Sequence, residues 1–311
     1  MSTNQTSTQS LQEKKLRAKI AELKGKKHLP EQMVDLVATV ATLQNSYLPT
    51  VAFAKGRESL SADTIQKISP PEQRYTGLSI LPGKDFPIDM PLTEDLAAAL
   101  LKSIPTAAPM LKNYAEELAT VLTGNPSILE AACNEIRDTS RLDKDMPLLE
   151  AWGREHPDAP HFFRFVLTSA AMPSRVTLGR ILGQEHDNEK AWPHGHCPVC
   201  GNQPLMGRLE GKEGRRMHTC SFCAFEYRAA RMGCPFCLAP ETEGSEYHVS
   251  DDEPGYLLSV CNACKNYFKI ADFREFDRPW FPLLDDLSSL TLDLYAMQMG
   301  YKRPTLSGWG F

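Results

Sequence analysis

Apolar residues recur at three- and four-residue steps through the first 187 residues, and this spacing places them on one face of a helix. Polar and charged residues occupy most positions between them. The spacing predicts helices over residues 11–24, a segment that starts after Pro30 and carries 33–43, and residues 96–104, 111–122, 127–137, 143–152 and 162–182. The first part of the chain is therefore expected to be a helical bundle or array.

Capping residues and prolines predict where some of these helices begin and end. Thr93 is the expected N-cap of the third helix, and Pro105 is expected to end it. Pro173 is expected to interrupt the last helix, because proline has no backbone N–H to donate. Residues 81–92 contain three prolines and a glycine, which predict an extended loop packed on the helices.

After residue 187, short alternating segments separated by turns replace the helical spacing. Residues 203–209 and 215–219 flank a glycine-bearing turn, and residues 246–249 and 256–260 flank a second one, so each pair predicts a β-hairpin. Helical spacing returns over residues 282–300, where Gly300 suits the position after the helix end. The apolar stripe of this closing helix consists of Leu283, Leu284, Leu287, Leu290, Leu294 and Met297.

These changes divide the chain into three expected parts. Residues 1–187 form a helical domain, residues 188–278 carry two small β modules at 197–223 and 234–264, and residues 279–311 form a C-terminal helix and tail. The expected fold class is thus multidomain, α plus small β. The tail aromatics Trp309 and Phe311 are expected to pack on their own chain rather than on a partner.

Composition and charge exclude several classes of protein. A chain of 311 residues with 42% hydrophobic residues buries a sizeable core, and its formal net charge of −5 gives no general attraction for nucleic acid or anionic lipid. No stretch reaches the roughly 18 to 20 apolar residues of a membrane span, and the start lacks the pattern of a secretory signal. We expect a cytoplasmic protein. The basic residues Lys14, Lys15, Arg17 and Lys19 are expected to form a solvated helix face.

Eight of the nine cysteines lie between residues 197 and 264 and form four C-x-x-C pairs, far more than chance gives. In a reducing compartment, clustered thiols more often hold a metal than form disulfides. Two such pairs supply the tetrahedral set of four sulfurs that zinc and iron both accept. The ninth cysteine, Cys133, lies on the apolar face of a predicted helix and is expected in the core.

The predicted hairpins indicate which pairs meet, because each hairpin returns the second pair of its module to the first. The expected ligand sets are Cys197, Cys200, Cys220 and Cys223 at one metal, and Cys234, Cys237, Cys261 and Cys264 at the other. A crossed arrangement, first pair with fourth and second with third, stays open. The residues do not select iron over zinc.

Other chemistries have less support in the residues. Four thiolates leave no open coordination position, and the motifs of hydrolases, metalloproteases and P-loop proteins are missing from the sequence, so no enzyme is expected. His194 and His196 adjoin the first pair and are expected outside the ligand set. Residues 197–240 carry a net charge of +3 and residues 241–270 one of −4, which suits a protein partner better than nucleic acid.

The motifs around the cysteines resemble those of the formate dehydrogenase accessory protein FdhE family. The resemblance covers residues 192–303. The matching residues are His196-Cys-Pro-Val-Cys-Gly201 with Pro204 and Gly207, the three later C-x-x-C pairs, Asn266-Tyr-Phe-Lys-Ile270, Asp285–Leu294 and Gly300-Tyr-Lys302.

The resemblance implies a helical domain followed by two rubredoxin-like metal modules, with the eight cysteines as ligands and iron as the favoured metal. It also implies a maturation factor that binds the catalytic subunit of formate dehydrogenase in the cytoplasm. The main alternative is a rubredoxin-like redox or thiol-exchange protein. A nucleic-acid-binding zinc ribbon is the weaker alternative.

Overall fold

The computed structural model describes residues 2–50, 66–67, 69–74, 76–137, 146–240, 244–307 and 309. The α-helices are α1 (Ser2–Lys24), α2 (Glu31–Tyr47), α4 (Pro71–Arg74), α5 (Met90–Ala107), α6 (Lys112–Gly124), α7 (Ser127–Ile136), α8 (Pro147–Glu155), α9 (Phe162–Gly183), α10 (Pro282–Ser288) and α11 (Leu290–Gln298). The strands are β1 (Pro204–Glu210), β2 (Arg215–Cys220), β3 (Glu226–Arg228), β4 (Ser245–Val249), β5 (Tyr256–Cys261) and β6 (Tyr267–Ala271). The expected fold class, helices followed by a small β region and C-terminal helices, is confirmed.

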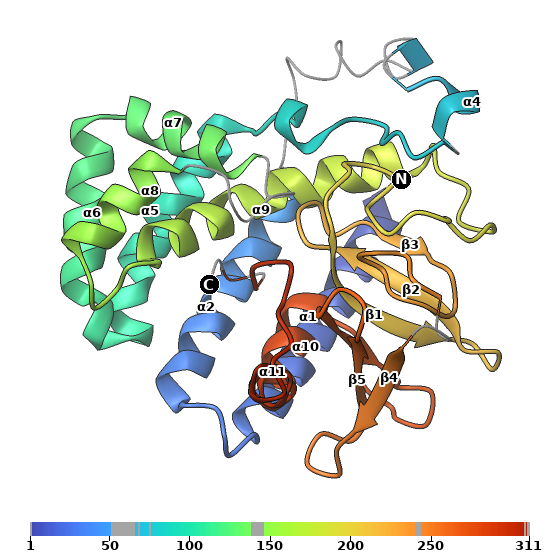
Figure 1. Ribbon diagram of the computed structural model, residues 1–311. Coiled ribbons are helices and arrows are strands. Elements are labelled where there is room, and N and C mark those ends of the chain that lie inside the picture. The colour runs from blue at the N-terminus through green and yellow to red at the C-terminus, as the bar shows by residue number, and fades with distance from the viewer. Residues whose placement is uncertain are drawn as a thin grey trace.

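Helices α5 to α9 gather on one side of the molecule and the strands on the other, with α1 and α10 between them (Figure 1). The apolar face of α2 packs on α5 and α9. Residues of α1 and α10 enter the same core, among them Leu23 and Leu287. In the described part of the chain, no helix is long and apolar enough to cross a membrane.

The long helix α9 runs without a break through Pro173, so the predicted interruption is wrong. Proline leaves the carbonyl one turn earlier, that of Ser169, without its helical donor. The buried Gln44 of α2 donates its side-chain amide to this oxygen at 3.0 Å. A partner from another helix thus satisfies the freed carbonyl and the helix continues.

The start of α5 also differs from the prediction. The N-cap is Asp89, whose carboxylate accepts the backbone N–H of Leu92 at 3.2 Å. Thr93 lies one turn inside the helix, where its hydroxyl bonds the carbonyl of Asp89. The helix ends at Ala107, two residues beyond Pro105.

The predicted closing helix is two helices, α10 and α11, which separate at Ser289. The buried ammonium of Lys269 donates a hydrogen bond to the Asp286 carbonyl at 2.7 Å, and so satisfies this acceptor near the end of α10. The change of direction leaves Leu294 and Met297 exposed, against the predicted stripe, and buries Leu292 and Ala296 on the sheet. The α11 helix does end as expected, with Gly300 at a φ of +84°.

The six strands form one sheet in the order β3-β2-β1-β6-β5-β4. The predicted hairpins β1–β2 and β4–β5 are both present, and each gains a third strand, β3 or β6, that the sequence pattern did not predict. The two three-stranded units join through parallel pairing of β1 with β6, at Gly207 with Ile270 and Arg208 with Ala271.

Lys19 is fully buried, so the prediction of a wholly solvated basic face on the first helix is wrong at this residue. Its ammonium lies 2.6 Å from a carboxylate oxygen of Asp285, which is also buried, and donates to the Tyr256 hydroxyl at 3.3 Å. This ion pair ties α1 to α10 beside strand β5.

Trp309 packs on its own chain, with its indole N–H donating to the Leu283 carbonyl at 3.2 Å. Phe311 and residues 143–145 of the predicted helix 143–152 lie outside the described residues. Cys133 is fully buried in the helical core, as expected, and burial raises the pKa of its thiol to about 12.

Candidate metal centres

The eight paired cysteines converge into two groups, in each of which the four sulfur atoms lie within 4.8 Å of one another. The first cysteine cluster consists of Cys197, Cys200, Cys220 and Cys223, and the second of Cys234, Cys237, Cys261 and Cys264. The structure therefore joins first with second pair and third with fourth, and not in the crossed arrangement. None of these cysteines forms a disulfide.

Each of the four C-x-x-C pairs forms the same type of backbone turn. The residue after each pair has a positive φ, at Gly201 (+78°), Ala224 (+53°), Leu238 (+61°) and Lys265 (+57°). The N–H of that residue donates to the carbonyl of the first cysteine in its pair. The N–H of that first cysteine in turn bonds the carbonyl two residues after the pair. This closed turn points both sulfurs of a pair to the same side.

The spacing of the sulfurs fits a tetrahedral metal ion. An ion bonded to four sulfurs at about 2.3 Å separates neighbouring sulfurs by about 3.8 Å. In the first cluster, Cys197 lies 3.8 Å from Cys223 and Cys200 lies 3.3 Å from Cys220. The corresponding Sγ–Sγ distances in the second cluster are both 3.7 Å. Each cluster can therefore hold one metal ion, and the same positions face each other in both.

Backbone amides point at the sulfurs as well. Val199 and Phe222 donate to the Sγ atoms of Cys197 and Cys220 at 3.4 and 3.3 Å, and Phe236 donates to that of Cys234 at 3.4 Å. Such donors favour the thiolate form, because they stabilise negative charge on sulfur.

The pKa values of the thiols differ within each cluster. Burial raises the pKa of Cys197 and Cys223 well above the ordinary thiol value. At Cys220, hydrogen bonds from the neighbouring thiols outweigh burial and lower the pKa. The matching residue of the second cluster, Cys261, has its pKa lowered in the same direction, because backbone amides oppose burial there. Metal binding replaces the remaining thiol protons and so depends on pH.

The two clusters differ in exposure. All four cysteines of the first cluster are buried. In the second cluster Cys237 is exposed and Cys264 is partly exposed. Solvent or a partner therefore reaches the second cluster more easily.

The proline-rich loop, together with Ile80 just before it, covers the first cluster. The sequence predicted only that this loop packs on the helices. The N–H groups of Ile80, Leu81 and Gly83 donate to the carbonyls of Pro198, Val199 and Cys200, each at 2.9 Å. Phe86 of the same loop meets the Phe222 ring edge-on, with centroids 5.4 Å apart. The loop thus runs beside the first C-x-x-C pair and donates hydrogen bonds to its backbone, as an added β-strand would.

Helix α9 closes the other side of the first cluster. Gly179 lies so close that a Cβ atom there would be 2.7 Å from the Cys223 carbonyl oxygen. Arg175, one turn earlier, is almost fully buried and lies over the Phe222 ring at 5.0 Å. Burial lowers the pKa of Arg175 to about 10, and the nearby thiolates of the cluster act in the opposite direction. The sequence did not predict a role for Arg175, because its spacing shows only that it belongs to one face of a helix.

The histidines lie outside both clusters. His196 places Nε2 2.8 Å from the Gly77 carbonyl and stacks near His194, with ring centroids 5.6 Å apart. His218 is buried in the sheet against Phe268, and His248 lies 3.8 Å from Glu246.

Comparisons with known proteins agree with these features. Residues 196–231 match the family model described as the FdhE central domain. A curated protein named "Protein FdhE homolog" from Aquifex aeolicus is 32% identical over 141 residues, 44% of this chain and 48% of that protein. The protein named "Protein FdhE" from Escherichia coli K12 is 32% identical over 120 residues, 37% of this chain and 38% of that protein. The matched segments thus span less than half of these relatives.

A solved structure extends the likeness of fold to nearly the whole chain. The crystal structure of the FdhE protein from Pseudomonas aeruginosa aligns with a TM-score of 0.57 and 21% identity, covering 95% of this chain and 94% of that one. The central-domain match and the curated relatives show that this chain is similar to FdhE proteins over less than half of its length, and the solved structure shows that the fold is shared over nearly all of it.

Proposed function

We propose that this chain is a non-enzymatic accessory factor for formate dehydrogenase that binds its catalytic subunit in the cytoplasm, and that each cysteine cluster holds a metal ion. The observation that carries the proposal is the pair of pre-formed four-sulfur clusters within a fold of the FdhE family. Four thiolates saturate a tetrahedral ion, so neither cluster offers a free position for substrate.

The proposed ligands are all eight cysteines of the two clusters, with iron favoured over zinc. The four-sulfur geometry accepts either metal, and the preference for iron rests on the family. When bound, the metal cross-links the two turns of each module and, as iron, can carry one electron. The chain itself supplies the turns, the amide donors and the buried Arg175 around the sulfurs.

Anaerobic purification followed by metal analysis and an absorption spectrum tests the metal assignment. We expect two ions per chain and the visible absorption of an iron–sulfur bond. Cys197→Ser and Cys234→Ser are each expected to lose one ion, because removing one ligand weakens a site that is coupled to folding. Cys133→Ala, outside the clusters, is the matched control and should retain both ions. Unchanged metal content in both serine variants would contradict the ligand assignment.

Co-purification with the formate dehydrogenase catalytic subunit tests the partner. We expect the tagged full chain to retain that subunit and a deletion strain to lose formate dehydrogenase assembly. An unrelated cytoplasmic protein carrying the same tag is the control. If the subunit is not retained and assembly proceeds in the deletion strain, the proposal is wrong.

We also propose the division of the chain at residues 187/188 and 278/279. It is supported by the end of α9 at Gly183 and the end of β6 at Ala271, which leave the intervening sheet with both clusters. In this proposal residues 1–187 and 279–311 support the modules and present the remaining surface to the partner.

Redox or thiol-exchange activity is the second candidate, and the exposure of Cys237 favours it. A colourless protein that holds zinc and shows no change with dithionite would count against this candidate. We do not propose nucleic-acid binding, because two arginines of the basic segment are not available to a phosphate backbone on the surface. Arg216 is buried, and Arg208 pairs with Glu210 and Glu226 at 3.2 and 3.0 Å.

A further inference from the structure

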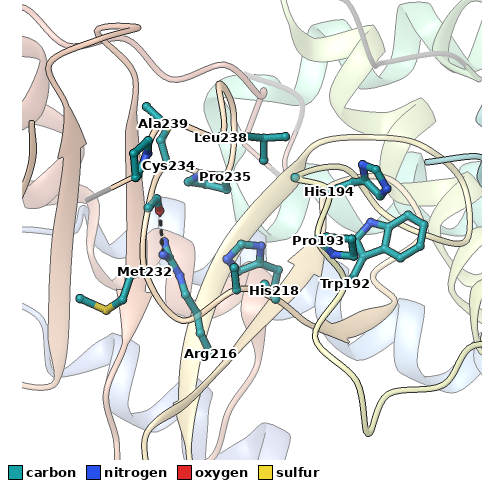
Figure 2. Close-up of a pocket in the computed structure, with 15 residues that line it drawn as sticks. Trp192, Pro193, His194, Arg216, His218, Met232, Cys234, Pro235, Leu238 and Ala239 are labelled. Carbon is teal, nitrogen blue, oxygen red and sulfur yellow. Dashed lines mark hydrogen bonds between the residues drawn. The ribbon is translucent and has the colours of Figure 1, made fainter. Parts of the chain in front are cut away.

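A small recess of about 110 Å³ lies beside the second cysteine cluster, at the place where the two modules meet (Figure 2). Its walls come from the segment before the first C-x-x-C pair, from strand β2 and from the third pair. These walls touch, since a Cβ atom on Gly195 would lie 1.6 Å from the Pro235 carbonyl oxygen. A ligand held here would therefore contact both modules.

Arg216 of strand β2 lines this recess although only 2% of its surface is exposed. Its Nη1 donates to the Gly233 carbonyl at 3.0 Å, a hydrogen bond drawn as a dashed line in Figure 2. Its guanidinium also lies over the Phe268 ring at 5.3 Å. Its Nε and Nη2 atoms are buried and have no hydrogen-bond partner among the described residues. None of the ion pairs of the described chain includes Arg216, and the groups that act on its charge are the hydroxyls of Tyr247 and Tyr227 and the sulfur of Cys234.

The two unpartnered nitrogens form the side of the guanidinium that binds oxyanions. The Nε–H and one Nη–H bond are parallel, and together they match the two oxygens of a carboxylate or a phosphate. A buried donor without a partner costs free energy, and the cost is greater when the group is charged. Leaving both donors of this edge unused is therefore unfavourable unless a ligand completes them.

His218 adds a second buried polar group to the same recess. Only 2% of its surface is exposed, and neither ring nitrogen has a hydrogen-bond partner among the described residues. The imidazole ring of His218 carries at least one N–H group, which offers a further donor to a ligand in the recess.

The surroundings are positively charged. Arg216 also lines an adjoining recess of about 470 Å³, whose other charged residues are Arg215, Arg228, Arg231 and Glu213. Three further arginines against one carboxylate attract an anion towards the mouth of the smaller recess.

We propose that this recess binds a small oxyanion, a carboxylate or a tetrahedral ion such as phosphate, on the Nε and Nη2 edge of Arg216, with His218 beside it. The size of the recess limits the ligand to a group of a few heavy atoms. The same carboxylate chemistry could come from a free ion or from an acidic side chain of a partner. The proposed contacts of the anion are Arg216 and His218 and not the proposed metal ligands, although Cys234 lines the same recess and its sulfur acts on the charge of Arg216.

Thermal unfolding of the full metal-loaded chain tests the proposal, with sodium acetate and sodium phosphate titrated separately and sodium chloride as the salt control. A ligand that binds the folded state raises Tm with a saturable dependence on its concentration. We expect saturation with acetate or phosphate in the wild type and in Arg154→Lys, whose exposed side chain lies on α8 outside both recesses. Arg216→Lys is expected to lose it, because lysine cannot offer two parallel donors.

A measurement on the wild type keeps the test valid if Arg216→Lys does not fold. In wild-type protein labelled with ¹⁵N-arginine, the Nε–H signal of Arg216 should shift with anion concentration along the same saturation curve. A response to acetate alone indicates a planar carboxylate ligand, and in that case a short peptide with a free C-terminal carboxylate should compete while its amide does not. Responses no larger than those to chloride, or equal responses in Arg216→Lys, would overturn the proposal. Loss of one metal ion from Arg216→Lys with an unchanged anion response would instead make Arg216 a counter-charge for the second cluster.

Discussion

Single residues after the C-x-x-C pairs carry much of the local geometry of the clusters. Three of the four left-handed positions are not glycine, namely Ala224, Leu238 and Lys265. A side chain at such a φ costs about 1 kcal/mol relative to a conformation that suits it. The hydrogen bonds of the closed turn hold these residues there.

Replacing Ala224 with glycine should not destabilise the protein and is expected to raise the free energy of unfolding by up to about 1 kcal/mol, because glycine adopts positive φ without steric strain. Chemical denaturation measures the change. Ala230→Gly, at a residue without a positive φ, is the control and should lower stability by a few tenths of a kcal/mol to about 1 kcal/mol. A larger loss at Ala224 than at Ala230 would contradict this account of the turn.

The buried pair of Lys19 and Asp285 gives a second prediction at this scale. Lys19→Met leaves the carboxylate of Asp285 buried without its cation, and we expect a loss of about 3 to 5 kcal/mol in unfolding free energy. The exposed pair of Lys24 and Asp35 at 2.7 Å is the control, and Lys24→Met should lower the free energy of unfolding far less than Lys19→Met does, because water screens an exposed ion pair.

The loss in Lys19→Met should shrink as pH falls. Burial raises the pKa of Asp285, so the folded variant takes up a proton more readily than the unfolded chain, and its stability rises as the pH decreases towards that pKa. A loss that is independent of pH, or no larger than that of Lys24→Met, would show that the pair is not needed.

At the scale of elements, the two modules have the same hairpin and third strand but different surroundings. The first cluster lies under the loop carrying Ile80 and Phe86 and against α9, whereas the second has Cys237 exposed and Cys264 partly exposed. The proposed metal ions should therefore differ in how easily they are released.

A chelator such as EDTA should remove one of the two ions faster than the other, and the faster one should come from the second cluster. Metal release measured on Cys237→Ser, which retains the first site, should show the slow phase alone. Cys200→Ser is the matched variant and should show the fast phase alone. Equal rates for both phases, or the reverse assignment, would contradict the effect of burial.

The elements themselves were largely predictable from the sequence. Helical spacing located the helices, and the two hairpins were correct, since both signals are local. Two of the predictions that failed are ones in which a residue distant in sequence acts on a backbone group. Gln44 satisfies the carbonyl freed by Pro173, and Lys269 ends α10 beside Ser289.

At the scale of the whole molecule, helix α9 connects the helical core to the first cluster. Gly179 allows the approach, since a Cβ atom there would lie 2.7 Å from the backbone oxygen and 3.3 Å from the sulfur of Cys223. Leu178 and Leu182 join the same apolar cluster as Cys197 and Cys220. The folding of the module and that of the helices are thereby coupled.

Gly179→Ala is expected to destabilise the protein by about 1 to 3 kcal/mol through overpacking, although alanine favours helix more than glycine does. Thermal unfolding and metal content should both respond, with the first site weakened and the second unchanged. Gly124→Ala, with open space around the added methyl group, is the control and should change stability by less than about 1 kcal/mol. Retention of wild-type stability in Gly179→Ala would mean that α9 does not pack rigidly on the cluster.

The sequence by itself determined the eight paired cysteines and the helical character of residues 1–187, and it favoured the grouping of the pairs by hairpin, because each depends on residues close together in the chain. The tertiary structure then excluded the crossed arrangement. Only the tertiary structure decided the parallel joining of β1 with β6, the cover of the first cluster by Ile80 to Phe86, and the buried positions of Arg175 and Arg216. These features depend on contacts between residues far apart in sequence. An isolated arginine or proline-rich loop carries no periodic or spacing signal that would reveal such a contact.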